Sequence, residues 1–589
     1  MKQFFITVAG VVVGFFLLFF ITLFLIIAIG VAAALSSNDK NAKSQGNSQV
    51  LRIDLRSGMT DQPQVGLFQE TPSLLGLVDT LATAQRDERV KGLFIRANPY
   101  GMGPVQAEQI RTAIQQFRGA GKFVIAHAQG FEGTSVTSYL SVSAVDELWL
   151  QGTASFAATG LATETAFYGG VFEKLKAKPE FEQFYEYKSA ANSYTQKTFT
   201  EAHRTATLSW ITSIFDSAMD QIAEDRGMTR TALQALTDMA PLSAEHAVEF
   251  GLADKLGHVI EAKEAALLRA GNAQMVELDD YVGPSTPSGQ YPMVALIEGE
   301  GAIVTGQGGG GNPFAGNTGI YSDQMAQAII DATKNDKVKA ILIRVNSPGG
   351  SAIASDQIWH AIERAKAKDK KIIVSMGQVA ASGGYYLAAG ADAIIAYPTT
   401  ITGSIGVLGG KIVLDETFDL VGYNVEQLSV GGEYAGAYSA TTSFTESQRA
   451  AFRAGMADTY EDFTSKVAAG RNLPIERVLE IAKGRVWTGR QALELGLVDE
   501  LGGYETAIAK TKELIGLSDS DQILLKRFPA PQSQLEQLFD IFGISAEAVS
   551  VLSKLHVLAN TDEVKALLKV QQLSEHGPAE LEVNLPTVH

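Results

Sequence analysis

"KVKAILIRVNSPGG" (residues 337–350) joins a run of apolar and β-branched side chains to a glycine-rich end. Such a run is typical of a buried β-strand, and the glycines mark the loop that follows it. Similar short runs, VALIEG, KIIVSM and AIIAYP, lie nearby in the chain and alternate with helical stretches such as SDQIWHAIERAKAK. This alternation predicts an α/β domain.

The same strand has a second copy in the chain. RVKGLFIR, from Arg89, matches KVKAILIR, from Lys337, and AVEFGLADKLG, from Ala247, matches ALELGLVDELG, from Ala492. In both pairs the copies lie about 245 residues apart, and this spacing stays nearly constant over most of the two halves. A repeat of this length indicates a duplicated domain and not a solenoid.

The limits of the two copies follow from changes in composition. A Pro/Gly/Ser-rich stretch at residues 281–292 has the character of a linker, so we expect a first repeat over residues 45–285 and a second over residues 291–526. The segment RFPAPQS then breaks the pattern. Residues 527–589 are expected to form a helical C-terminal tail that packs on a neighbour.

Composition excludes several functional classes. The formal net charge of −17 argues against a nucleic-acid-binding protein, which would present a basic surface to the phosphates. The chain has no cysteine, which excludes disulfides, thiolate nucleophiles and cysteine metal sites together. No cofactor and no metal ion is expected.

The N-terminus carries an uncharged apolar segment over residues 4–35. About 20 apolar residues are enough to cross a bilayer as a helix, so residues 1–36 are predicted to be a membrane anchor. A cleaved signal peptide is the alternative, but its apolar region is only about 7 to 15 residues long. Lys2 precedes the segment and Lys40 and Lys43 follow it, so the positive charges on its two sides are nearly balanced and the positive-inside rule barely favours one orientation. We expect the bulk of the chain outside the cytoplasm.

The second repeat holds the candidate nucleophile, Ser382, in the segment AASGGYY. Small neighbours let a substrate carbonyl approach a serine hydroxyl closely. The glycine loops NSPGG, at residues 346–350, and Gly383–Gly384 can point backbone amides at a developing oxyanion. In the first repeat the serine is matched by Ser135, but both glycine loops are lost. Acyl chemistry is therefore expected in the second repeat.

A base for this serine is missing from its own repeat. No histidine lies between residues 361 and 555, and His360 and His203 are interpreted as structural or surface residues. Lysine can serve if burial lowers its pKa. The first repeat has Lys188 in FEQFYEYKSAANSY, opposite Gly432 in the matching segment of the second. Each repeat keeps what the other has lost, which predicts one composite site between the two.

These motifs, AASGGYY, NSPGGS, TGSIGV and YKSA, resemble those of the signal peptide peptidases of the SppA type, in their long two-repeat form. The resemblance implies two tandem crotonase-like or Clp-protease-like α/β spiral domains after an N-terminal transmembrane helix. It also implies a Ser/Lys dyad, in which Ser382 matches the nucleophile and Lys188 the general base. Ser404 matches the serine that hydrogen-bonds the lysine amine, and the amides of Gly350 and Gly383 match the oxyanion donors.

The same resemblance implies a membrane-anchored serine endopeptidase that degrades cleaved signal peptides and other apolar peptides. It further implies a homotetramer, anchored by a single pass in the bacterial inner membrane with its bulk on the periplasmic side. One residue conflicts with this mechanism. If the segment FYEYKSA is extended, Glu186 lies on the same side as Lys188 and would stabilise the ammonium form of the base. For Lys188 to act as a base, either the strand bends or Glu186 reaches solvent.

Two other functions remain open at this point. A crotonase-type acyl-CoA enzyme would use the glycine-loop amides to hold a thioester enolate and would need no serine nucleophile. A non-catalytic membrane scaffold would also fit the duplication and the anchor. The response of activity to loss of Ser382 distinguishes the first from a peptidase, and labelling of Ser382 by a serine-reactive probe would count heavily against the second.

Overall fold

The computed structural model describes residues 48–530, apart from residues 66–69, 72, 134–135, 285–288, 290 and 309–318. The predicted anchor at residues 1–36, Ser135 and nearly all of the predicted tail lie outside the described residues. Among the described helices, none has both the length and the apolar character that crossing a bilayer requires.

The first repeat folds around a six-stranded sheet in the order β10-β6-β5-β4-β1-β11, and every pairing in it is parallel. The strands span Gln49–Asp54 (β1), Val90–Arg96 (β4), Phe123–Ala128 (β5), Glu147–Leu150 (β6), Lys255–Leu256 (β10) and Gln274–Glu277 (β11). Helices cover the sheet: Leu74–Ala84 (α2), Pro104–Gly119 (α3), Val136–Ser143 (α4), Glu201–Asp225 (α7) and Val259–Arg269 (α10). Central strands of a parallel sheet are buried on both faces, which explains the nearly continuous apolar run of β4.

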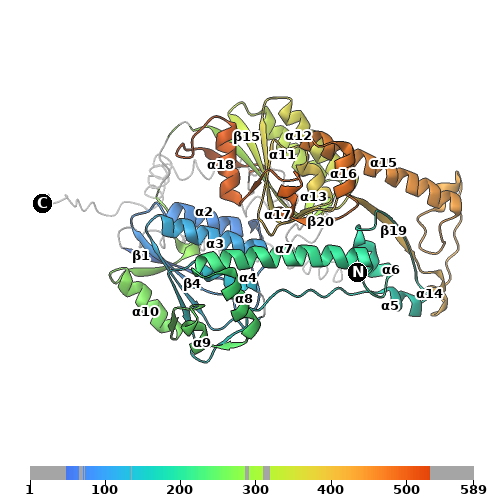
Figure 1. The fold of residues 1–589 in the computed structure, drawn as a ribbon. Coiled ribbons are helices and arrows are strands. Elements are labelled where there is room, and N and C mark those ends of the chain that lie inside the picture. Colours follow the sequence, from blue (N-terminus) through green and yellow to red (C-terminus); the bar gives the residue numbers. More distant parts are fainter. Residues whose placement is uncertain are drawn as a thin grey trace, which may run out of the picture.

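The second repeat repeats this plan in the order β20-β18-β16-β15-β12-β22, and β17 pairs with β16 and β21. Its strands span Met293–Glu300 (β12), Val338–Ser347 (β15), Lys371–Ala381 (β16), Ala393–Ala396 (β17), Ile401–Gly403 (β18), Val486–Thr488 (β20), Glu500–Leu501 (β21) and Leu524–Arg527 (β22). Its helices are Ser322–Lys334 (α11), Ala352–Lys366 (α12), Gly383–Ala388 (α13), Glu446–Arg471 (α15), Ile475–Ile481 (α16), Gly489–Glu494 (α17) and Tyr504–Leu514 (α18). The prediction of two α/β repeats is confirmed (Figure 1).

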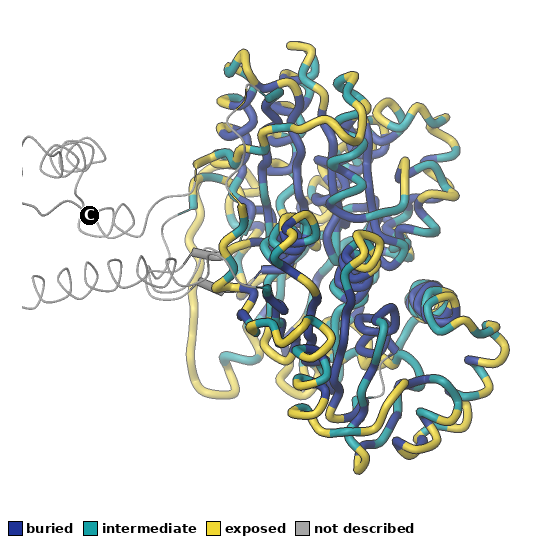
Figure 2. Tube along the Cα trace, turned by 90° about the vertical axis from the view of Figure 1, so that its left-hand side faces the viewer, coloured by how far each residue is buried: buried dark blue, intermediate teal, exposed yellow. Residues whose placement is uncertain are grey.

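The two repeats lie side by side, and Figure 2 shows their buried residues gathered along the strands. A buried ion pair joins them. Arg344 lies within β15; its guanidinium is fully buried and its Nε donates to Asp61 Oδ2 at 2.9 Å. Asp61 belongs to the first repeat, so a cross-repeat contact satisfies a charge that would otherwise be buried alone.

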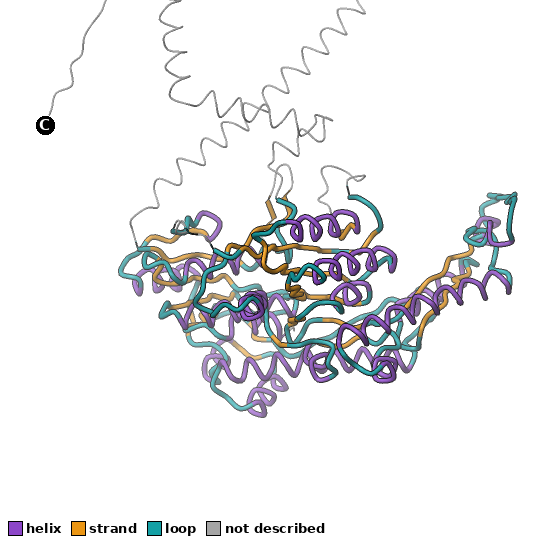
Figure 3. Tube along the Cα trace, turned by 90° about the horizontal axis from the view of Figure 1, so that it is seen from above, coloured by secondary structure: helices purple, strands orange, loops and turns teal. Residues whose placement is uncertain are grey.

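A narrow arm extends from this body, as Figure 3 shows. Its ribbon consists of β8 (Lys178–Phe184) and β19 (Val407–Val413), which pair antiparallel with Phe184 opposite Val407 and Lys178 opposite Val413. Helix α15 packs along the ribbon. Strand β8 belongs to the first repeat by sequence and β19 to the second. The arm is therefore a joint product of both repeats.

Candidate active site

Ser382 lies at the sharp turn between β16 and α13. Its backbone has φ 54° and ψ −119°, a conformation that non-glycine residues rarely adopt and that concentrates at functional sites. Gly349, with φ 104°, makes the turn possible, because a Cβ at that position would stand 2.7 Å from the Cβ of Ser382. The glycine neighbours thus leave little side-chain volume next to Ser382.

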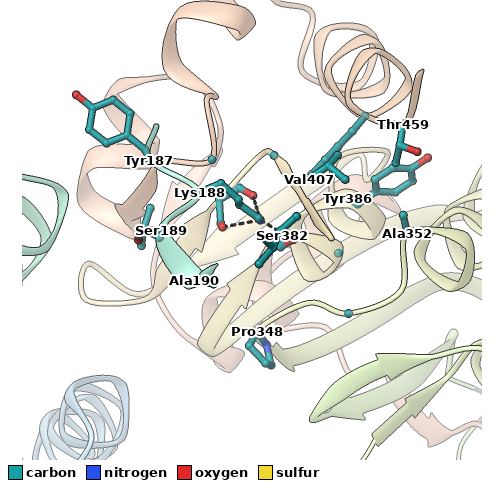
Figure 4. Close-up of a pocket in the computed structure, with 18 of the residues that line it drawn as sticks. Tyr187, Lys188, Ser189, Ala190, Pro348, Ala352, Ser382, Tyr386, Val407 and Thr459 are labelled. Carbon is teal, nitrogen blue, oxygen red and sulfur yellow. Dashed lines mark hydrogen bonds between the residues drawn. The ribbon is translucent and has the colours of Figure 1, made fainter. Parts of the chain in front are cut away.

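Lys188 reaches this serine from the first repeat. It lies four residues after the end of β8. Its Nζ lies 3.0 Å from Ser382 Oγ, 2.8 Å from the Ser404 carbonyl oxygen and 3.0 Å from Ser404 Oγ (Figure 4). Ser404 follows β18, which pairs with the end of β16. The structure therefore brings the three predicted side chains Ser382, Lys188 and Ser404 together at one point.

The Lys188 amine is almost completely shielded from solvent. Only 7% of the residue is exposed, and burial lowers its pKa from the ordinary lysine value to about 7. Within the described part of the chain no carboxylate forms an ion pair with this amine, so no opposite charge offsets the desolvation of the ammonium. A substantial fraction of Lys188 is therefore neutral near pH 7 and can accept a proton.

The expected conflict with Glu186 does not arise. Strand β8 ends at Phe184, and the amide of Lys188 turns back to donate to the Tyr185 carbonyl at 3.1 Å. Because the chain is not extended here, Glu186 and Lys188 do not share a side. The Glu186 side chain is 51% exposed, and its carboxylate lies 3.9 Å from Lys483 Nζ.

The amides of Gly350 and Gly383 lie beside Ser382. Gly383 is the first residue of α13, where a backbone amide has no acceptor inside the helix. The bridge between Gly350 and Ile303 uses the amides of Ile303 and Ser351, and the Gly350 amide has no acceptor among the described residues. A Cβ on Gly383 would stand 3.2 Å from the Gly350 nitrogen, so the two glycines are close neighbours. Such a pair can stabilise an oxyanion.

These groups open into a cavity of about 580 Å³. Its walls come from both repeats, and Figure 4 shows Tyr187 and Ser189 on one side of Ser382 and Tyr386 and Thr459 on the other. The size suits a few residues of an extended peptide.

His203, which the sequence suggests to be a structural or surface residue, also lines this cavity. It lies in the first turn of α7 and packs against the Phe199 ring at 4.8 Å and the Phe167 ring at 6.0 Å. The segment FTEAHR gives no sign of this, because only the tertiary fold turns that helix end toward Lys188. His360 is exposed on α12 and does not line the cavity.

Comparison with known proteins agrees with the duplicated plan. The model of the family "Peptidase family S49" matches residues 116–271 and again residues 364–518, once in each repeat. The "Clp protease" family model matches residues 317–402.

Long relatives match most of the chain. "Serine protease SPPA, chloroplastic" of Arabidopsis thaliana is 30% identical over 88% of this chain and 77% of its own length. "Protease 4" of Salmonella typhi is 28% identical over 85% of this chain and 83% of its own. "Protease 4" of Haemophilus influenzae is 30% identical, with coverage of 75% and 73%. These matches decide between a peptidase and the two alternatives, an acyl-CoA enzyme and a scaffold: the chain belongs to peptidase family S49 and is a serine peptidase.

Proposed function

We propose that the protein is a membrane-anchored endopeptidase with a Ser/Lys dyad, in which Ser382 is the nucleophile and Lys188 the general base. The observation that carries the proposal is the 3.0 Å distance between Lys188 Nζ and Ser382 Oγ in a site that lowers the lysine pKa to about 7. A base with a pKa near the working pH is the most effective one for proton transfer.

The reaction then proceeds in two halves. The neutral Lys188 amine, held by the carbonyl and hydroxyl of Ser404, takes the Ser382 proton as Oγ attacks the scissile carbonyl. The amides of Gly350 and Gly383 hold the oxyanion, and each donor of this kind contributes roughly 3 to 4 kcal/mol to the transition state. The Lys188 ammonium gives its proton to the leaving amine, and the acyl group stays on Ser382. Water, deprotonated by Lys188, then hydrolyses the ester.

The proposed substrates are cleaved signal peptides and other apolar peptides. Support comes from the relatives, among them a "Putative signal peptide peptidase SppA" of Enterococcus faecium that is 33% identical over 35% of this chain and 60% of its own length. The uncharged segment at residues 4–35 supports anchoring in the bacterial inner membrane, with the bulk on the periplasmic side. Such an anchor would hold the site next to apolar peptides left in the bilayer.

We further propose a homotetramer. The arm ribbon pairs β8 of the first repeat with β19 of the second, and the corresponding segments, residues 422–428 and 162–168, form no strand in the described structure. Leu428 is 97% exposed and Val430 fully exposed. Pairing between residues 422–428 of one copy and 162–168 of the next would repeat the arm contact head to tail. Such contacts form a closed ring when four successive rotations complete a full turn. Leu428→Asp should therefore dissociate the assembly in light scattering, and an unchanged mass would contradict this contact.

A serine-reactive fluorophosphonate probe tests the catalytic proposal. Ser382 should be labelled in the wild type, and labelling should fall at least a hundredfold in Lys188→Met, because the hydroxyl then has no base. Equal labelling of both proteins would overturn the assignment of Lys188.

A further inference from the structure

The two ends of the active-site cavity differ in chemistry. The second repeat builds one end, where Ala352, Val407 and Phe463 present apolar side chains. The polar atoms at this end are already engaged: the Tyr386 hydroxyl bonds to Asp356 at 3.0 Å, and the Thr459 hydroxyl donates to the Gly455 carbonyl at 2.9 Å. This end therefore offers a substrate little beyond an apolar surface.

The first repeat builds the other end, and it is polar. Thr165, Ser189, Ser193 and His203 line it. Within the described part of the chain, the three hydroxyls have no hydrogen-bond partner. A peptide that enters this end meets several groups that can still donate or accept a hydrogen bond.

The imidazole of His203 is held rigidly here. Its backbone amide donates to the N-cap hydroxyl of Thr200 at 3.3 Å, which fixes the first turn of α7. The rings of Phe167 and Phe199 pack against the imidazole edge to face. Because both the backbone and the ring plane are constrained, the position of the imidazole at the cavity wall is set before a substrate binds.

The surroundings of His203 favour its neutral form. Burial lowers its pKa, and the positive end of the α7 dipole also disfavours the imidazolium form. Nδ1 is buried and has no partner among the described residues, so a proton there would be an unsatisfied donor. The tautomer with its proton on Nε2 leaves only an unpaired acceptor at Nδ1, and in that tautomer the Nε2 N–H is the donor that His203 can offer to a ligand.

The polar end is the leaving-group end. In peptide hydrolysis the base must return its proton to the leaving amine, so the leaving group lies on the side of Lys188. The chain after Lys188 turns directly into this wall, and the Asn192 side chain ties it to the start of α7 through a 3.3 Å bond to Thr200. His203 is thus on the side where the residue after the scissile bond would lie.

We infer that the first repeat forms the leaving-group subsite and that His203 sets its preference. Nε2–H donates a hydrogen bond to a side-chain oxygen of the residue that follows the scissile bond, which favours serine, threonine, asparagine or glutamine there. The apolar end takes the residue before the bond. This inference rests on the proposed roles of Ser382 and Lys188.

The test uses the full-length protein in detergent and matched pairs of internally quenched peptides. Within a pair, only the residue after the scissile bond differs, asparagine against leucine or serine against alanine. The wild type should favour the polar member by about fivefold to tenfold in kcat/KM, the effect of one net hydrogen bond. His203→Phe keeps the ring packing and should bring the ratio to within about twofold of one, whereas His203→Gln, which keeps a donor, should retain most of it. His360→Phe, the control histidine outside the cavity, should change nothing.

Labelling by a fluorophosphonate separates the possible outcomes, since its fluoride leaving group needs no subsite. Equal labelling of wild type and His203→Phe, together with the lost preference, supports the inference. An unchanged preference in His203→Phe, or a loss of labelling that parallels the loss of cleavage, would overturn it. Failure of the proposed function is a different result: cleavage would then survive Ser382→Ala.

Discussion

The Lys188 amine lies 3.0 Å from the Ser382 hydroxyl, although 194 positions separate the two residues in the chain. The arm makes this possible, because β8 pairs with β19 over its whole length and ends four residues before Lys188. Pairing of the arm strands therefore controls the distance between the proposed base and nucleophile.

Ser382→Ala should abolish peptide hydrolysis without loss of stability. Only one hydroxyl is removed from a loop of small residues, and a proposed nucleophile contributes several orders of magnitude to kcat. The measurement is turnover of an apolar peptide, with the thermal midpoint as the stability check. Ser135→Ala, at the matching position of the first repeat, should be silent. Turnover above about a hundredth of wild type in Ser382→Ala would contradict the serine mechanism.

Activity should rise with pH through a midpoint near the lowered Lys188 pKa of about 7. Below that pH the amine is protonated and cannot accept the serine proton, so kcat/KM falls as the pH decreases. Lys188→Arg should be inactive throughout, because a guanidinium stays protonated at every accessible pH. A midpoint close to the ordinary lysine value would show that the base is solvated.

Lys188→Met should raise the stability of the protein at neutral pH. The folded-state pKa of Lys188 is lower than its unfolded value, so the unfolded chain binds more protons between the two values and stability rises with pH across that interval. The penalty for burying the ammonium is therefore largest at and below about pH 7 and disappears above the ordinary lysine pKa of about 10.4. Thermal midpoints of both proteins across this range measure it. A stabilisation that does not shrink as pH rises would exclude the burial of charge as its cause.

Gly484→Ala should reduce kcat by about a hundredfold, because small displacements of a catalytic group are costly. Gly484 has φ +76°, and a Cβ there would stand 2.5 Å from Lys188 Cβ. The matched control is Gly516→Ala, since Gly516 has φ +78° but open space around it. Both variants carry the same backbone strain, so only Gly484→Ala should lose activity. Equal kinetics in the two variants would indicate that the lysine tolerates the shift.

The α/β class and the duplication could be predicted because they depend on local patterns, such as the apolar run of β15 and its copy in β4. The pairing of Lys188 with Ser382 could be predicted because each repeat keeps the residue that the other has lost. The arm was not predictable in this way. Strand β8 has the sequence KPEFEQF, and its charged residues do not give the apolar pattern that predicts a strand. Its partner β19 comes from the other repeat.

The placement of His203 was missed for a related reason. A histidine in the first turn of a helix is uninformative until the helix end is positioned, and here the Asn192–Thr200 contact and the ring of Phe167 do so. For Glu186 the sequence leaves two alternatives to a conflict with Lys188, a bend in the strand or a carboxylate that reaches solvent. The structure shows both, since the chain turns after Phe184 and the Glu186 side chain is 51% exposed near Lys483.

The division of the site between the repeats also has a consequence for biosynthesis. On the proposed assignment, a nascent chain that has emerged only as far as the linker holds an amine without its hydroxyl. At about 5 to 20 residues per second, the ribosome adds Ser382 roughly 10 to 40 s after Lys188. During that interval no fragment of the growing polypeptide can hydrolyse a neighbour. Proteolytic competence begins only when the second repeat has been translated and has docked on β8, so the order of synthesis itself restrains the enzyme.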